Sequence, residues 1–410
     1  MSADDRTILR DLVKQYVELC QQPVQQERRR LWRALNSKQP TRPLIYIRAY
    51  AAGEVPEVTT LRCQDAFWRG YEHHLRDRLY HARFDDDSIY APWLTVGAAR
   101  WAPPHGLWGV PTPFHRPQAG GAGVWDPPLK TEADLAKLAH PKHEVDEAAT
   151  ARTLARVQDA VGDLIALEVD RAPLYRAWGA DLSTHLGYLR GIGPLMLDMM
   201  DRPAWLHRVL AHMRDGILRT HQQAEAAGHW RLSQHENQAM PYAAELEDPA
   251  ANSAPVPRRR LWWFCASQEL AQVGPRQFDE FMFQYQMPIC REFALVAYGC
   301  CEDLTHKIGV LRQLPNLRRI AVSPMANVAK CAAQIGGDYV ISYRPSPADM
   351  VSYRFDEARV RTILRRDFAA LRAHGCLFDV TLKDVETVER EPQRVRRFVE
   401  ITREEIARLG

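Results

Sequence analysis

One short segment concentrates side chains that bind metals or act as nucleophiles. Cys300, Cys301 and Glu302 follow the apolar run FALVAYG, and His306 lies close behind them. Thiolates bind zinc strongly, and they are also the nucleophilic form of cysteine. The segment predicts a metal site with Cys300, Cys301 and Glu302 among its ligands. The alternative is one small buried cysteine beside an incidental neighbour.

Cys376 is the fourth candidate metal ligand, at the edge of the apolar run LFDVTL. Only tertiary structure can bring it next to Cys300, and adjacent C-terminal strands of a barrel would do so. A lone cysteine after a glycine is otherwise a structural residue.

His235 and Glu236 are candidate acid/base groups, and either could complete a metal site. They lie in SQHENQ, a polar segment after a long helical pattern. Because side chains alternate along a strand, only one of the two would face a barrel mouth. The alternative is a polar strand end whose side chains are hydrogen-bonded.

Substrate-binding candidates follow the first two apolar runs. Arg48 ends LIYIR and is a candidate catalytic residue, because a guanidinium can hold a carboxylate or another anion. Tyr50, Asp87 and Tyr90 are candidate substrate contacts. Asp87 belongs to three consecutive aspartates, for which a solvated turn is the alternative interpretation.

The elements that would position these residues are short apolar runs alternating with helical patterns. Around eight runs in this alternation, without a Gly-rich phosphate loop, predict an α/β protein with a closed (β/α)8 TIM barrel, whose strand ends carry the active site. We expect an N-terminal helical extension over 1–40 and the barrel over 41–410. The extension either caps the barrel or forms a homodimer interface. The Gly- and Pro-rich stretch 102–128 is expected to be a long loop.

Composition excludes several classes of protein. Among 410 residues there are 54 Lys and Arg against 51 Asp and Glu, a net charge of +3, which argues against a nucleic-acid binder. No apolar run is long enough to cross a membrane. The eight cysteines are too sparse for a disulfide framework, and the acidic N-terminus is unlike a signal peptide, so we expect a cytoplasmic protein.

Three segments together resemble the uroporphyrinogen decarboxylase-like superfamily, specifically its corrinoid-linked methyltransferase branch. They are ADLSTHLGYLRGIGPLMLDMMDRPAWLHRVLAHM, the run from YGCCEDLTHKIG to DYVISYRPSP, and GCLFDVTLKDVETVEREPQRVRRFVEITREE. The resemblance covers roughly residues 40–410 and implies a TIM barrel.

The resemblance also implies a zinc site formed by His-x-Cys and a distant cysteine. The two cysteines fall on Cys300 and Cys376, whereas the histidine position falls on Tyr298, a departure from the pattern. Glu302, Cys301, His235 and His306 are the candidates for the third ligand.

The implied activity is zinc-dependent methyl transfer between a small-molecule substrate or thiol and a corrinoid (cobalamin) carried on a partner protein. The alternative is a metal-independent decarboxylase or lyase acting on a carboxylated substrate. In the decarboxylase the first strand carries two arginines that hold carboxylates, and here only Arg48 remains. A non-enzymatic binding protein is the third class.

Overall fold

The computed structural model describes residues 1–116, 118 and 123–409. Eight strands form two parallel sheets, and a ninth and tenth form a small antiparallel hairpin. The strands are β1 (Leu44–Ile47), β2 (Trp93–Gly97), β3 (Phe114–His115), β4 (Val124–Trp125), β5 (Ala166–Asp170), β6 (Trp262–Cys265), β7 (Leu295–Tyr298), β8 (Leu317–Val322), β9 (Val340–Tyr343) and β10 (Leu377–Leu382).

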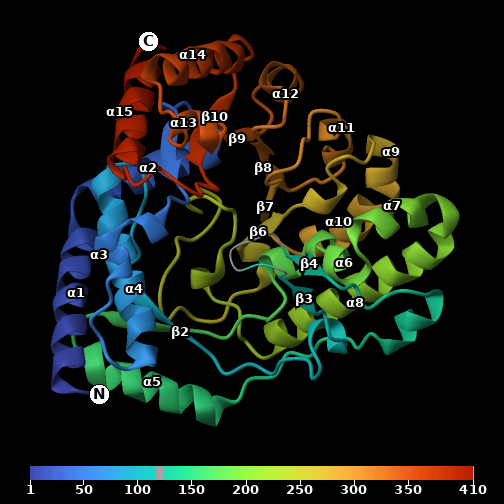
Figure 1. Ribbon diagram of the computed structural model, residues 1–410, viewed down its shortest axis with the longest axis horizontal. Coiled ribbons are helices and arrows are strands. Elements are labelled where there is room, and N and C mark those ends of the chain that lie inside the picture. The colour runs from blue at the N-terminus through green and yellow to red at the C-terminus, as the bar shows by residue number, and fades with distance from the viewer. Residues whose placement is uncertain (117, 119–122, 410) are drawn as a thin grey trace.

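Helices surround these strands on their outer side (Figure 1). They are α1 (Ala3–Gln21), α2 (Val24–Asn36), α3 (Pro56–Thr59), α4 (Ala66–His81), α5 (Glu147–Val161), α6 (Ser183–Arg190), α7 (Ile192–Asp201), α8 (Pro203–Ala226), α9 (Pro275–Phe278), α10 (Gln284–Cys290), α11 (Ile308–Leu311), α12 (Val328–Ile335), α13 (Pro347–Met350), α14 (Glu357–Ala373) and α15 (Gln393–Ala407). No helix in the described ranges is long and apolar enough to span a membrane.

The larger sheet has six strands in the order β1-β10-β9-β8-β7-β6, and every neighbouring pair is parallel. β2 and β5 form a separate parallel pair. The structure is a mixed α/β fold with two parallel sheets. The predicted closed barrel is not seen, because within the described residues no ladder of backbone hydrogen bonds joins the two sheets. We call the edge where the parallel strands end the carboxyl edge, and the edge where they begin the amino edge.

The sequence prediction failed at the segment RLSQHENQ, which forms no strand. Leu232–Gln234 is a short 3-10 helix, and the next residues run beside β6 with one backbone hydrogen bond, from Glu236 N–H to Trp262 O (3.3 Å). Polar side chains at most positions leave this segment without the apolar face that holds a strand in a core.

The N-terminal helices pack directly on the strands and their helices. Leu9, Val13 and Tyr16 of α1 share an apolar core with Trp68 of α4 and Leu94 of β2. In the next helix, α2, the side chain of Asn36 contacts the buried Arg319 guanidinium of β8 (2.7 Å). Both helices thus contribute to the core of the same body.

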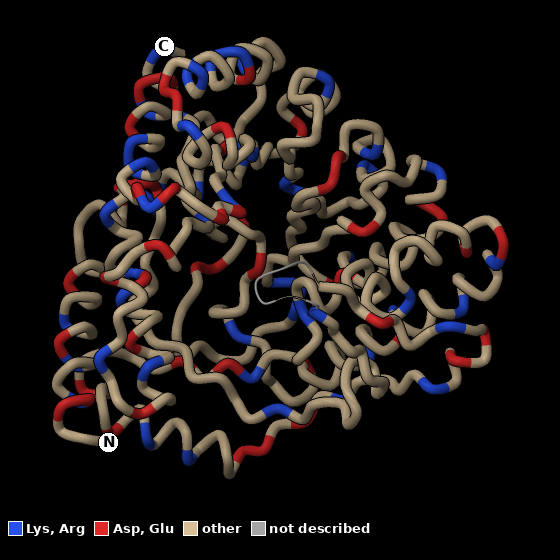
Figure 2. The backbone as a smooth tube through the Cα atoms, in the orientation of Figure 1, with Lys and Arg blue, Asp and Glu red and all other residues tan. Residues whose placement is uncertain are grey.

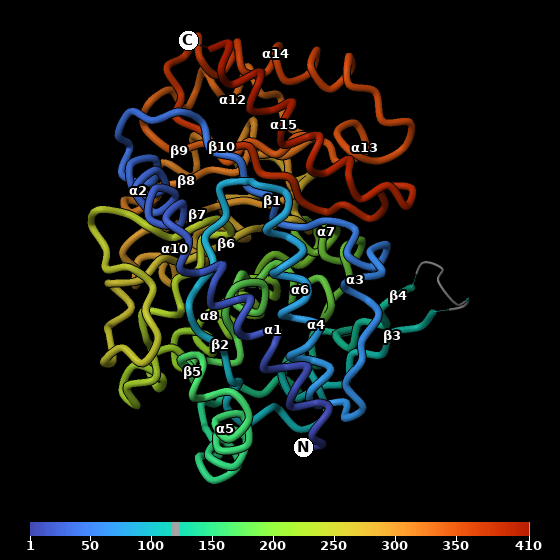
Figure 3. The backbone as a smooth tube through the Cα atoms, turned by 90° about the vertical axis from the view of Figure 1, so that its left-hand side faces the viewer, coloured from blue at the N-terminus to red at the C-terminus, as the bar shows by residue number. Residues whose placement is uncertain are grey.

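The predicted loop 102–128 contains the β3–β4 hairpin, which projects from one side of the molecule (Figure 3). Trp125 of the hairpin packs on Tyr188 of α6 with ring centroids 4.6 Å apart. Residues 117 and 119–122 lie outside the described part of the chain.

Candidate active site

Cys300 lies at the carboxyl edge, two residues after β7, where a tight turn fixes its position. Gly299 has a φ of 98°, and a Cβ there would meet the Cδ1 atom of Leu304 at 2.5 Å, so only glycine fits the turn. Beyond the turn, the Glu302 carboxylate accepts hydrogen bonds from the backbone N–H groups of Cys300 (2.8 Å) and Ser267 (2.9 Å). Glu302 thereby ties the end of β7 to the end of β6.

Lys383 brings its ammonium group to both thiols from the end of β10. Its Nζ lies 3.0 Å from the Cys300 Sγ and 2.9 Å from the Cys301 Sγ, and the two sulfurs are 3.7 Å apart. Lys383 also pairs with the neighbouring Asp384, whose carboxylate is 3.4 Å from the Cys301 Sγ. Two sulfurs, one ammonium group and one carboxylate therefore form a compact cluster.

The cluster favours a thiolate on Cys300. A hydrogen bond from the Cys301 thiol, together with the charges of Arg344 and Lys383, lowers the pKa of Cys300 to about 6 despite burial. The pKa of Cys301 moves upward, mainly because its proton is held in that hydrogen bond and because it is partly buried. The two thiols share one proton near neutral pH.

Cations dominate the surroundings of the thiolate. Arg344, directly after β9 and buried, donates a hydrogen bond from its Nη1 to the carbonyl oxygen of Cys300 (3.0 Å). Burial lowers the pKa of Lys383, but the Cys300 thiolate and Asp384 raise it overall, so the ammonium group stays charged. Opposite charges attract each other more strongly in a partly buried site than in water.

A second cluster of polar side chains connects the carboxyl ends of β1 and β5 with the segment after α8. Arg176 pairs with Asp170 at the end of β5, and its Nε lies 3.4 Å from Glu236 Oε1. Arg48 Nη1 donates a hydrogen bond to Gln238 Oε1 (3.3 Å). The second oxygen of Glu236 is buried without a hydrogen-bond partner, and burial raises the pKa of this carboxyl group.

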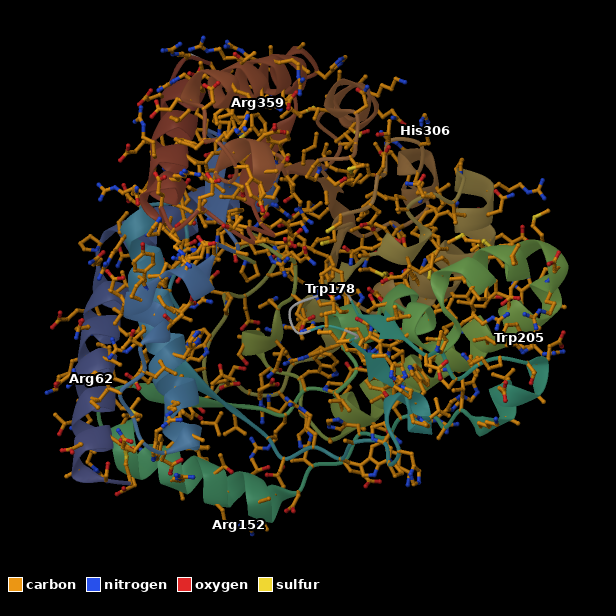
Figure 4. The ribbon with its side chains drawn as sticks, viewed as in Figure 1. Arg62, Arg152, Trp178, Trp205, His306 and Arg359 are labelled. Carbon is orange, nitrogen blue, oxygen red and sulfur yellow. The ribbon has the colours of Figure 1, made fainter. Side chains whose placement is uncertain are left out.

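Two aromatic side chains lie beside the thiols. Trp178 packs edge-on against Phe264 of β6 with ring centroids 4.7 Å apart, in an apolar cluster that includes Cys300 and Cys301. Figure 4 places Trp178 near the centre of the molecule, whereas His306, which is exposed, lies at its periphery. Trp178 therefore belongs to the apolar surroundings of the two thiols.

The structure does not bring Cys376 to Cys300. Cys376 precedes β10 and lies at the amino edge, with its Sγ 3.6 Å from the carbonyl oxygen of Ala332, and burial raises its pKa to about 11. In parallel strands the residue before one strand and the residue after another lie at opposite edges. The predicted pairing of the two cysteines is therefore wrong.

The side chains around Cys300 do not fit a zinc ion. Both oxygens of Glu302 are engaged by backbone N–H groups, and the ammonium group of Lys383, which has no lone pair, occupies the space beside both sulfurs. Within the described ranges, no three side chains of His, Cys, Asp or Glu are grouped to hold a metal. We therefore derive no chemical step through zinc.

The two candidate tyrosines are held by protein partners. The Tyr50 hydroxyl donates to the Asp77 carboxylate (2.7 Å). Tyr90 is buried, and its hydroxyl lies 2.7 Å from His81 Nδ1. These contacts occupy the polar atoms that would otherwise be offered to a substrate.

Asp87 is a structural residue and not the solvated turn that was the alternative. It is buried, accepts a hydrogen bond from the Ile45 N–H (2.8 Å) and pairs with Arg42 (2.6 Å). These contacts anchor the start of β1, at the amino edge. Arg48 and Tyr50 follow the end of β1, at the carboxyl edge, whereas Asp87 does not.

His235 and Glu236 lie in a segment that forms no strand, and their side chains have different neighbours. His235 faces the amino side of β6, where its Nδ1 accepts the Trp262 N–H (3.2 Å), and burial lowers its pKa to about 4. Tyr298, at the implied histidine position, is buried, and its hydroxyl donates to Gln286 Oε1 (2.6 Å). Neither side chain joins the thiol cluster, whereas Glu236 lies beside Arg176 at the carboxyl edge.

Sequence reasoning missed Lys383, Arg344, Arg176 and Trp178. Lys383 and Arg344 each come directly after an apolar run, in LFDVTLK and VISYR, so the rule that selected Cys300 would have found both. Arg176 and Trp178 lie several residues beyond β5, and no sequence signal points to them.

The fold is shared with a methyltransferase from Methanosarcina mazei. Its structure superposes with a TM-score of 0.52 at 10% sequence identity, covering 92% of this chain and 97% of that one. The likeness is one of fold. No family model and no curated protein sequence matches the chain.

Proposed function

We propose that this protein is a methyltransferase in which the Cys300 thiolate is the nucleophile. The observation that carries the proposal is the contact of Lys383 with Cys300 at the carboxyl edge, together with the lowered pKa of that cysteine. In α/β barrels and related parallel sheets, this edge is where active sites lie. The fold shared with a methyltransferase agrees with this assignment.

The first step is a displacement at the methyl carbon. The Cys300 thiolate attacks the methyl group of a donor, an S–CH3 bond forms, and the bond from carbon to the donor atom breaks. The electron pair leaves with the donor atom, which needs a proton when it is a poor leaving group. Glu236 is a candidate proton source, because burial raises its pKa and so favours the protonated carboxyl group.

The second step returns the cysteine to its starting form. An acceptor nucleophile attacks the methyl carbon, the S–CH3 bond breaks, and its electron pair goes back to the sulfur of Cys300. The charge that develops on sulfur lies 3.0 Å from the Lys383 ammonium group. A fixed cation at the atom where negative charge appears lowers the barrier of such a step.

A corrinoid carried on a partner protein is the methyl donor or acceptor that we propose, and a small molecule is the other substrate. Such a partner has to reach the carboxyl edge. Exposed apolar side chains on the hairpin, Val124 and Trp125, and on α7, Leu197 and Met200, support a docking surface there. The hairpin rests on α6, which follows the loop that carries Trp178.

We further infer that the two parallel sheets are parts of one (β/α)8-type barrel of the uroporphyrinogen decarboxylase-like superfamily. The contacts Arg48–Gln238 and Arg176–Glu236 support this, because they join the residues after β1 of the larger sheet and after β5 of the smaller one to the same segment, 236–238.

Methyl transfer from methylcobalamin with a trideuterated methyl group tests the proposed function. After incubation with the reduced protein, peptide mass spectrometry should find the label on Cys300. The Cys300→Ser variant should carry none. The Cys376→Ser variant should be labelled like the wild type, because Cys376 lies at the opposite edge. Labelling of another residue, or equal cleavage of the cobalt–carbon bond by Cys300→Ser, would overturn the proposal.

A carboxylate-directed decarboxylase or lyase is the second candidate function. It is favoured by cations at the same edge, where the charge of Arg48 acts on both Arg344 and Asp384. This candidate predicts release of CO2 from a polycarboxylated probe such as uroporphyrinogen, and loss of the release in Arg48→Met. Methyl transfer to Cys300 without CO2 release would decide against it.

A further inference from the structure

A pocket lies at the amino edge, opposite the thiol cluster. Its volume is about 790 Å³, which is within the range of small-molecule sites. It is formed by the residues before β1, the start of β10, and the ends of α14 and α15. Figure 1 shows these helices side by side next to β10.

The lining combines an apolar surface with arginines. Pro43, Phe378, Ile406 and Leu409 supply much of the apolar part. Arg42, Arg372 and Arg403 also line the pocket, and none of the described lining residues is Asp or Glu. Figure 2 shows both basic and acidic residues along α14 and α15, and those that line the pocket are basic.

Two of the three arginines, Arg372 and Arg403, are not fully paired with acceptors among the described residues. Asp87 pairs with Arg42 and also lies 4.0 Å from Arg403, so one buried carboxylate faces two guanidinium groups. Among the described residues, the buried Arg403 Nε and Thr41 Oγ1 have no hydrogen-bond partner, while the Arg403 Nη2 donates to the carbonyl oxygen of Asp85. Arg372 is exposed and forms no ion pair within the described part of the chain.

We propose that this pocket binds an amphipathic organic anion, a small molecule with an apolar body and one carboxylate. The apolar wall would bury the body, and Arg372 and Arg403 would hold the carboxylate. Arg372 is exposed and has no ion-pair partner among the described residues, so it can take the carboxylate, and Arg403 adds a second positive charge to the lining. A carboxylate fits a guanidinium better than a neutral acceptor does, because both of its oxygens accept.

The site is independent of the thiol chemistry. Cys376 lines this pocket, whereas Cys300 lies beyond the other end of the strands. A ligand here is therefore a second ligand of the protein and not the methyl donor.

Calorimetric titration of the full chain with decanoate tests the proposal, with 1-decanol and acetate as matched probes. Decanoate should bind at least tenfold more tightly than decanol, and acetate should show no measurable binding. Arg372→Gln should weaken decanoate binding about tenfold. Arg152→Gln should leave it unchanged, because Arg152 lies on α5 at the far side of the molecule (Figure 4).

A second variant fills the pocket without removing a charge. Ala407 lines it and is exposed, so Ala407→Trp should abolish decanoate binding while the thermal unfolding temperature stays near that of the wild type. Equal affinities for decanoate and decanol, or wild-type affinity in either Arg372→Gln or Ala407→Trp, would overturn the proposal. So would a wild-type protein that binds none of the probes.

Discussion

At Cys300, burial favours the neutral thiol, and hydrogen bonding and charge favour the thiolate. The hydrogen bond from Cys301 and the cations of Arg344 and Lys383 prevail, so the pKa falls to about 6, below the ordinary value of ~8.5. Each contributor can be removed separately, which gives two predictions at the scale of single residues.

Cys301→Ala should raise the pKa of Cys300, because the thiol that donates to its sulfur is lost. Cys301→Ser should keep most of the effect, since a hydroxyl group can donate in the same direction. The measurement is the pH dependence of the Cβ chemical shift of carbon-13-labelled cysteine. Identical midpoints for the alanine variant and the wild type would show that Cys301 has no part in stabilising the thiolate.

Lys383→Met should slow alkylation of Cys300 by iodoacetamide about tenfold at pH 6.5, because a smaller fraction of the sulfur is thiolate. Lys383→Arg keeps the positive charge and should lie closer to the wild type. The rate is followed on the Cys300 peptide by mass spectrometry. An unchanged rate in the methionine variant would contradict the role assigned to the ammonium group.

At the scale of elements, a residue's position before or after a strand decides at which edge of the sheet it lies, and the two edges are one strand length apart. The six residues of β10 span about 20 Å, with Cys376 before them and Lys383 after them. The apolar run LFDVTL predicts the strand correctly, but its direction relative to β7 decides which end residue meets Cys300. In a parallel sheet a residue before a strand lies at the amino edge, so the place of Cys376 ahead of LFDVTL already argues against a contact with Cys300, and the sequence interpretation chose the wrong end.

Gly299→Ala tests the turn that places Cys300. A Cβ in this left-handed conformation would be strained and would overlap Leu304, so we expect a loss of about 1–3 kcal/mol in the free energy of unfolding. Gly309→Ala is the matched control. Gly309 lies in helix α11 with open space around its Cα, so alanine there should be neutral or slightly stabilising. Urea unfolding measures both, and equal effects would contradict the account.

At the scale of the whole molecule, the sequence predicts the α/β class and the strands but not how the strands close. The eight apolar runs interpreted as strands are strands, whereas the polar SQHENQ segment, in which strand alternation was expected, is not. Hydrogen bonding between β2–β5 and the larger sheet depends on the global arrangement, which local patterns do not encode. Part of the site was predicted from the sequence, since Cys300, Glu236 and Arg48 lie at the carboxyl edge. The other candidates do not form part of the thiol cluster: Tyr50, Asp87, Tyr90, His235 and Cys376.

Acid sensitivity is a property of the whole fold, and His221 is one identifiable source of it. His221 is fully buried, and burial lowers its pKa to about 3, far below its unfolded value of ~6.5. The unfolded chain therefore binds a proton that the folded chain does not, and the stabilising difference is lost as the pH falls below 6.5.

Comparison of the wild type with His221→Gln isolates this contribution. The stability advantage of the wild type should shrink by about 1–2 kcal/mol between pH 7 and pH 5, measured by urea unfolding. His306→Gln, at an exposed position, should show no such change. A wild-type advantage that stays constant or grows on acidification would contradict the sign of the effect.

The central claim is that this protein's own side chains, without a metal, hold Cys300 as a thiolate at the carboxyl edge. The most direct test is the pH titration of ultraviolet thiolate absorbance in chelator-treated protein, taken as the difference between the wild type and Cys300→Ala. We expect a midpoint near 6 that chelation does not change. A midpoint at or above the ordinary ~8.5, or a thiolate signal that disappears on chelation and returns with added zinc, would contradict it.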